Sequence, residues 1–233
     1  WRDSLGGWVD ETFGKGDERF SLYFVGLFAI ALGINLAILS DLGVSPVSAF
    51  TVPLSQVVHI SLGIVTSICY SVFVLIEIAV LGKRFRLKNL LQVPFSIVFG
   101  FFVDFIGSLF SAITLPNYAV RFVVMMVGVV ACAVGAVMYI AMDVVPNPPE
   151  GLILAFCERF DIPFGRLKIV TDCIFVTLGI LLSVLFLGGV GDIREGTVIS
   201  AILTGKIISW LTKRWQPVFK RLAFPREEKK QNT

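Results

Sequence analysis

Six long apolar segments dominate this sequence and constrain its fold more than any other feature. A helix needs about 20 apolar residues, at about 1.5 Å each, to cross a hydrocarbon core of about 30 Å. The six segments cover residues 21–40, 64–81, 90–113, 121–142, 167–187 and 196–211. They are continuously apolar, without the alternation of a lipid-facing strand, so they predict transmembrane helices and not a barrel.

The composition agrees with a bilayer location. Hydrophobic residues make up 56% of the 233 positions, charged residues only 16%, and the mean hydropathy is +0.85. Soluble domains carry about 25% charged residues. We therefore expect an all-α polytopic membrane protein with six crossings, in contact with membrane lipid and without a nucleic-acid partner.

The basic residues predict the orientation. Four of them crowd the loop at 83–88, and seven more lie in the segment 213–233. Under the positive-inside rule both regions face the cytoplasm. We expect residues 1–19 to form a cytoplasmic arm, residues 213–233 a basic cytoplasmic tail, and both termini to lie on that side.

The chain also contains an internal repeat. A shift of 102 residues brings together Gly26 and Gly128, Gly33 and Gly135, Asp41 and Asp143, Pro46 and Pro148, Gly63 and Gly165, and, after a small insertion, Gly100 and Gly205. The copies are residues 20–113 and 121–212, with three crossings each. An odd number of crossings inverts the second copy, as in many secondary transporters. The glycines at helical spacing favour close packing of helices.

Each copy contains a proline-led segment too short to span a membrane. One segment begins at Ser45-Pro46 and runs to His59, and the other begins at Asn147-Pro148 and runs to Asp161. A capping residue followed by proline predicts a helix start. Transporters place such broken helices at substrate sites. An amphipathic helix lying in the membrane interface is an equal alternative.

Polar and ionisable residues around these helix starts are the candidate substrate-binding residues. Such residues are energetically costly at membrane depth and usually serve a function there. They are Asp41, Ser45, Pro46, Ser48, Asp143, Asn147, Pro148, Glu150, Arg166, Lys168, Asp172 and Thr197. Structural alternatives remain: Lys168 and Asp172 are four residues apart and can form a salt bridge, and Asp41 and Asp143 can cap helices.

The sequence predicts no catalytic residues, metal site or cofactor. With one histidine, His59, there is no histidine cluster, and a serine or cysteine nucleophile paired with histidine is disfavoured. There is also no glycine-rich phosphate loop. We therefore expect the protein not to be an enzyme.

Several motifs resemble the bacterial YczE/YitT-like membrane proteins. They are Asp41-Leu42-Gly43-Val44-Ser45-Pro46, Ile60-Ser61-Leu62-Gly63, Pro148-Pro149-Glu150-Gly151-Leu152-Ile153-Leu154, Pro163-Phe164-Gly165-Arg166-Leu167-Lys168, and the glycines from Gly188 to Gly205. The similarity covers about residues 20–210 and implies six crossings in a bacterial inner membrane. The first copy departs from the family pattern, with Pro46-Val47-Ser48 where relatives often have Pro-Trp-Asp.

The leading functional hypothesis is a secondary transporter or exporter of a small polar solute, anionic or zwitterionic. In it, Glu150, Asp143, Arg166, Lys168 and Asp172 supply charge pairing or proton coupling. The alternative is a non-transporting membrane partner that scaffolds or regulates another complex. Besides the solute and lipid, the expected partner is a second copy of the chain or another membrane protein. A vitamin-uptake subunit that needs an ATPase is a third hypothesis.

Overall fold

The computed structural model describes residues 17–142, 144–189 and 193–223, and these residues are helical, without β-strands. The α-helices are α2 (Asp17–Ser40), α3 (Pro46–Val58), α4 (Leu62–Leu81), α5 (Gln92–Phe110), α6 (Tyr118–Met142), α7 (Pro148–Phe160), α8 (Phe164–Leu182) and α9 (Glu195–Ala223). Two 3₁₀ segments, η1 (Gly82–Arg84) and η2 (Leu87–Leu91), join α4 to α5, and a π-helical turn, η3 (Ser183–Leu187), ends α8.

Five of these helical segments are long and apolar enough to cross a membrane: Arg19–Ser40, Leu62–Arg84, Leu87–Phe110, Tyr118–Met142 and Phe164–Leu187. They correspond to the first five predicted segments. The sixth predicted segment lies at the start of α9, where the apolar part, Gly196–Ile208, is shorter. A multi-pass membrane protein is therefore confirmed, with five candidate spans in the described residues.

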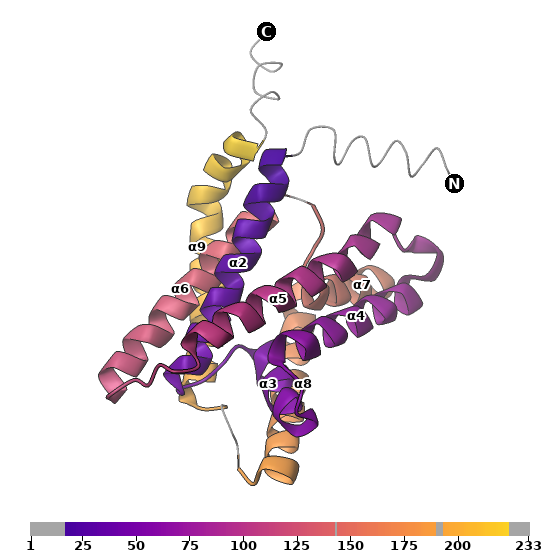
Figure 1. The fold of residues 1–233 in the computed structure, drawn as a ribbon. Helices are drawn as coiled ribbons and strands as arrows, with labels where there is room; N and C mark the ends of the chain where they lie inside the picture. The colour runs from indigo at the N-terminus through magenta and orange to yellow at the C-terminus, as the bar shows by residue number, and fades with distance from the viewer. Residues whose placement is uncertain (1–16, 143, 190–192, 224–233) are drawn as a thin grey trace.

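Helices α2 and α6 form the antiparallel centre of the molecule, with α5 packed against α2 and α9 against α6 (Figure 1). Glycines let the two backbones touch. A Cβ added to Gly33 would lie 2.5 Å from the Gly128 carbonyl oxygen, and one added to Gly135 would lie 2.5 Å from the Gly26 carbonyl oxygen. The predicted packing role of these small residues is confirmed.

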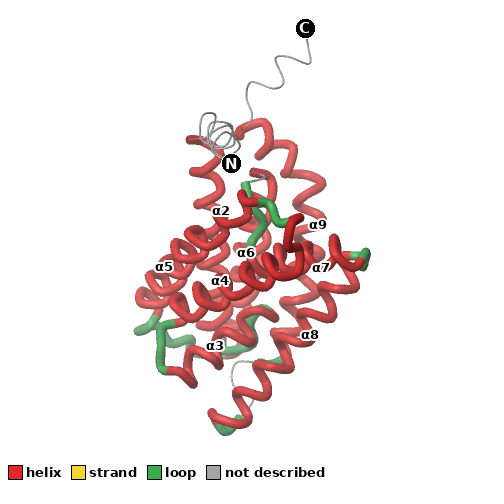
Figure 2. Tube along the Cα trace, turned by 90° about the vertical axis from the view of Figure 1, so that its right-hand side faces the viewer, coloured by secondary structure: helices red, strands yellow, loops and turns green. Residues whose placement is uncertain are grey.

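The two short helices begin and end at the predicted residues. Ser45 caps α3 by accepting the Ser48 N–H at 3.2 Å, Asn147 precedes α7, and Pro46 and Pro148 take the first helical positions. His59 and Asp161 end the helices in the left-handed conformation, with φ of 54° and 55°. Helix α3 packs against α8, and α7 packs against α4 (Figure 2).

A proline inside α3 explains how closely α8 approaches it. Pro53 lacks the N–H that would bond the Ala49 carbonyl in a regular helix. The Ala49 carbonyl oxygen instead faces Gly179 of α8, at a separation that leaves no room for a Cβ. This close contact holds α3 against the middle of α8.

Candidate functional site

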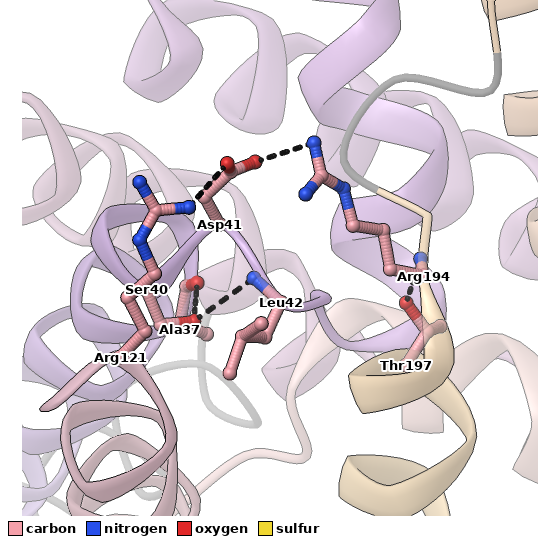
Figure 3. Close-up of polar contacts among 7 residues, drawn as sticks. All are labelled: Ala37, Ser40, Asp41, Leu42, Arg121, Arg194 and Thr197. Carbon is pink, nitrogen blue, oxygen red and sulfur yellow. Dashed lines mark hydrogen bonds and ion pairs between the residues drawn. The ribbon is translucent and has the colours of Figure 1, made fainter. Parts of the chain in front are cut away.

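Asp41, the first candidate residue, is engaged in two ion pairs. Its carboxylate lies 2.9 Å from Arg121 Nη1 at the start of α6 and 3.0 Å from Arg194 Nη2 just before α9 (Figure 3). The residue follows α2 in the left-handed conformation, with φ of 52°. The Asp41 ion pairs therefore tie the end of one helix to the starts of two others.

Thr197 joins the chain after α2 to the first turn of α9. The Val44 N–H donates to Thr197 Oγ1 at 3.2 Å, and the Gly196 N–H donates to the Leu42 carbonyl oxygen at 2.9 Å. Gly43 has φ of 151° and lies so close to the Thr197 nitrogen that a side chain would not fit. The Thr197 hydroxyl is thus used in joining the two segments.

Ser45 and Ser48 bond to one another, with their hydroxyl oxygens 2.8 Å apart. Pro46 between them is half-buried. The candidates Asp41, Ser45 and Ser48 of the first copy and Thr197 of the second copy therefore have partners within the protein, and their contacts hold α3 and α9 in place.

Glu150, in the first turn of α7, differs from these residues because part of its carboxyl group has no partner. Its Oε2 atom is buried and has no hydrogen-bond partner. The carboxyl group interacts electrostatically with the hydroxyl groups of Tyr23 in α2, Tyr70 in α4 and Tyr139 in α6. The Asn147 side chain lies beside Tyr70 and Glu150. Glu150 thus lies at the start of a helix that packs against α4 and α8.

A second buried carboxylate lies on the other side of Gly151. Glu77 of α4 is 1% exposed and accepts hydrogen bonds from Asn89 and, at 2.9 Å, from Gln92 Nε2. A Cβ on Gly151 would lie 2.9 Å from Glu77 Oε2 and 2.8 Å from Gln92 Oε1. The Gln92 oxygen is buried without a partner. Gly151 therefore allows α7 to approach these polar groups.

Helix α8 contributes a pair of opposite charges. Lys168 Nζ lies 2.7 Å from Asp172 Oδ1, which confirms the predicted salt bridge. Lys168 also interacts electrostatically with Glu150. Arg166 is exposed, and Asp143 lies outside the described residues. Of the second-copy candidates, Asn147, Glu150, Lys168 and Asp172 are brought together, with Pro148 beside Asn147 at the start of α7.

The environment of Glu150 favours its protonated form. Burial raises the pKa of the Glu150 carboxyl, and the Lys168 charge partly opposes this change. A buried carboxyl with a raised pKa can take up and release a proton under mild conditions. Among the described residues, no three histidine, cysteine or acidic side chains gather as a metal site.

Sequence reasoning missed four residues of this cluster. Tyr23, Tyr70 and Tyr139 lie inside long apolar segments, where an aromatic residue is ordinarily a packing residue, and Gln92 lies at the start of one. All four are at most 5% exposed. A polar atom within an apolar segment was the available signal, since buried hydroxyl and amide groups need partners.

Comparisons with known proteins agree with the predicted resemblance. The model of the family of unknown function DUF6198 matches residues 18–213. The chain is 28% identical to the uncharacterized membrane protein YczE of Bacillus subtilis (strain 168) over 82% of this chain and 83% of that protein. It is 25% identical to the uncharacterized protein YyaS of the same organism over 82% of this chain and 90% of that protein.

No solved structure matches the chain. The family match covers most of the chain and includes both short helices, the glycines of α2 and α6, and Glu150. The resemblance to YczE-like membrane proteins is therefore confirmed, and the chain belongs to the family of unknown function DUF6198.

Proposed function

We propose that the protein is a secondary transporter of a small polar solute, and not an enzyme, that works by alternating access between two inverted three-helix repeats. The observation that carries the proposal is the buried, unpartnered oxygen of Glu150. Glu150 lies in the first turn of α7, a second-repeat helix that packs against α4 of the first repeat and α8 of the second. A polar group left unsatisfied at membrane depth indicates a functional site.

Reciprocal contacts support the inverted repeat. A two-fold axis relates each residue of the first copy to the residue 102 positions later in the second. The contact of Gly26 with Gly135 should then recur between Gly128 and Gly33, and this second contact is present. Likewise α3 packs on α8 while α7 packs on α4. Such exchanged pairs are expected of duplicated, inverted units.

One pair of helices departs from this relation. In the first copy, Gly63 of α4 and Gly100 of α5 are in tight backbone contact. A Cβ added to either counterpart in the second copy, Gly165 of α8 or Gly205 of α9, would meet no other segment of the described chain within 4 Å. Alternating access predicts this difference, because the two repeats exchange their conformations between the inward-open and outward-open states. We propose a second state in which α9 closes on α8 and α5 separates from α4.

The proposal includes a sixth crossing, with both termini in the cytoplasm of a bacterial cell and the protein in the inner membrane. The apolar part of α9 is about 20 Å long at 1.5 Å per residue. The helix continues to Ala223, Lys206 can extend its charge toward the headgroups, and Trp210 suits the interface. The beginning of α2 and the end of α9 lie at the same end of the molecule (Figure 1).

Distances between spin labels test the second state. One pair is placed at Ile64 and Phe101, and a matched pair at Arg166 and Lys206, their repeat counterparts. All four side chains are exposed, so the labels do not disturb the packing. The native cysteines, Cys69, Cys132, Cys157 and Cys173, are first replaced by alanine.

We expect two populations in liposomes, one with the first pair close and the second pair apart, and one with the reverse. A shift in pH should change their ratio, because Glu150 changes its charge. If each pair shows one unchanging distance at every pH, alternating access between the repeats is excluded.

A membrane-partner role is the second candidate, and the surface of α8 favours it. Helix α8 and the turn η3 that follows it expose a continuous apolar face, including Ile169 of α8 at 66% and Leu185 of η3 at 71% exposure. A shallow groove on α8 is lined by Ile169, Val170, Cys173, Ile174, Thr177 and Leu178. A partner role predicts a stable complex with another membrane protein and a single conformation in the labelling experiment.

A further inference from the structure

Helices α4 and α5 form an open groove on the lateral surface of the protein. The two helices lie side by side (Figure 1), and the groove along them has a volume of about 560 Å³. Its floor contains small residues, and Gly63 and Gly100 are buried there. Its walls are apolar and exposed, with Ile64 at 52% and Phe101 at 65% exposure. Because both helices belong to candidate membrane spans, the groove faces the lipid.

The dimensions of the groove fit one hydrocarbon chain. It follows α4 from Gly63 to Leu75, which is about 18 Å at 1.5 Å per residue. Each leaflet contributes about 15 Å to the hydrocarbon core. Spread over the length along α4, the volume gives a mean cross-section of about 30 Å². A helix about 10 Å across has a cross-section of about 80 Å², so the groove admits a lipid chain but not a second helix.

Asp104 of α5 provides a charged end to this apolar groove. Its Oδ1 accepts the Gly63 N–H at 2.6 Å, and its Oδ2 accepts the Ser61 hydroxyl at 2.6 Å. A carboxylate offers about four acceptor positions, so further donors can bind from the groove, which Asp104 lines. The contact with Gly63, one residue after the span Leu62–Arg84 begins, places Asp104 near the boundary between the hydrocarbon core and the headgroups.

The negative charge of Asp104 is not balanced by the part of the chain that the structure describes. The ion pairs of the described residues involve Asp41 and Asp172, and no basic side chain pairs with Asp104. The start of α4 beside it contributes only about half a positive charge. A ligand with a cationic, hydrogen-bond-donating group at one end and a hydrocarbon chain at the other therefore complements the groove.

We propose that the groove binds a phospholipid with a primary ammonium headgroup, whose N–H groups donate to Asp104 while one acyl chain lies along α4 and α5. A phospholipid with a net negative headgroup would be repelled by the carboxylate. A choline headgroup has the same charges as an ethanolamine headgroup but has no N–H to donate. This inference requires only that the chain lies in a membrane, and it does not depend on transport.

Quenching of tryptophan fluorescence by brominated lipids tests the inference with the full-length protein in vesicles. The reporter is Phe101→Trp, in a background in which phenylalanine replaces the native Trp1, Trp8, Trp210 and Trp215. Phe186→Trp is the matched control, because Phe186 is also 65% exposed but lies in η3, away from the groove. The vesicles are phosphatidylcholine with the same small fraction of brominated phosphatidylethanolamine, phosphatidylcholine or phosphatidylglycerol, all with identical chains.

We expect phosphatidylethanolamine to associate with the Phe101→Trp reporter at least about fivefold more strongly than either other lipid, because hydrogen bonds between charged groups are strong. At Phe186→Trp the three lipids should quench about equally. This comparison needs no change at Asp104, so it holds whether or not a variant at that residue folds.

Two further substitutions separate the charge of Asp104 from the shape of the groove. Asp104→Asn keeps an acceptor for the Gly63 N–H and should abolish the preference for ethanolamine, while Asp161→Asn, the same change at an exposed residue, should keep it. Ser71→Leu fills the groove and should weaken the preference at least about twofold. Ser108→Leu is its control, since both hydroxyls bond a carbonyl of their own helix and Ser108 is exposed.

Equal quenching of Phe101→Trp by the ethanolamine and choline lipids, or stronger quenching by the glycerol lipid, would overturn the headgroup assignment. An equal preference for ethanolamine at Phe186→Trp would overturn the assignment to the groove. A preference that survives in folded Asp104→Asn would overturn the role of that carboxylate. These results leave the transport proposal to the spin-label distances.

Discussion

Asp41 combines an unusual backbone conformation with two ion pairs, and substitutions can separate their effects. Asparagine tolerates the left-handed conformation, so Asp41→Asn keeps the backbone as it is and removes the charge. The side chains of Asp41, Arg121 and Arg194 are 35–43% exposed, so solvent screens both pairs. Asp41→Asn should therefore lower the free energy of unfolding by no more than about 1 kcal/mol.

Asp41→Ala should lower the free energy of unfolding by about 1 kcal/mol more than Asp41→Asn does, because alanine is strained at positive φ. Apparent melting temperatures in detergent, followed by tryptophan fluorescence, measure both variants. An equal or larger loss in Asp41→Asn would mean that the ion pairs, and not the backbone, dominate at this position.

Glu150 should make stability depend on pH. Burial raises the pKa of the carboxyl in the folded protein above its ordinary value. The folded state therefore holds the proton more tightly than the unfolded state. The contribution to stability is fully present below the ordinary pKa and is lost as the pH rises through the higher folded pKa.

The wild type should therefore melt at a lower temperature above that folded pKa than below the ordinary one, and Glu150→Gln should reduce this difference. Thermal scans across the acid to neutral range measure it, with Glu158→Gln as the exposed control. A pH dependence identical in wild type and Glu150→Gln would assign the effect to other groups.

At the level of elements, the contact of α2 with α6 depends on the absence of side chains at four glycines. Gly33→Ala places a methyl group against Cys132 and the Gly128 carbonyl oxygen. Overpacking of this kind costs about 1–3 kcal/mol. Gly205→Ala is the matched change at a helical glycine with open space, where alanine is favoured by up to about 1 kcal/mol. Melting temperatures should fall for Gly33→Ala and stay level or rise for Gly205→Ala.

Structural features that depend on only a few neighbouring residues could be predicted from the sequence. Ser45-Pro46 and Asn147-Pro148 predict helix starts because capping and proline geometry act over three or four residues. Glu150 and Lys168 were predicted as candidate residues because ionisable side chains are costly at membrane depth. The partners of Asp41 could not be predicted, since Arg121 and Arg194 are distant in sequence and only the folded chain brings them together. Tyr23, Tyr70 and Tyr139 were missed because their rings resemble ordinary packing residues.

For the whole molecule, the arrangement of helices predicts which loops share a side of the membrane. Arg86 between η1 and η2 and Asn117 before α6 are both exposed, and α5 separates them. In a cysteine-free background, Asn117→Cys should react with a membrane-impermeant maleimide in intact cells, because its loop carries few basic residues. Arg86→Cys should react only after the cells are permeabilised. Reaction of both from the same side would contradict the proposed topology.

The hydrogen bonds between the chain after α2 and the start of α9 have a consequence for biosynthesis. Val44 bonds to Thr197 and Ser200, residues that the ribosome adds roughly 150 positions later. Until the last helix enters the membrane, the Val44 N–H and carbonyl groups lack these partners, and each costs about 1–3 kcal/mol while buried and unsatisfied. The segment that leads into α3 therefore gains these two partners only after the start of α9 has been made, so a chain cut before α9 leaves both Val44 groups unsatisfied.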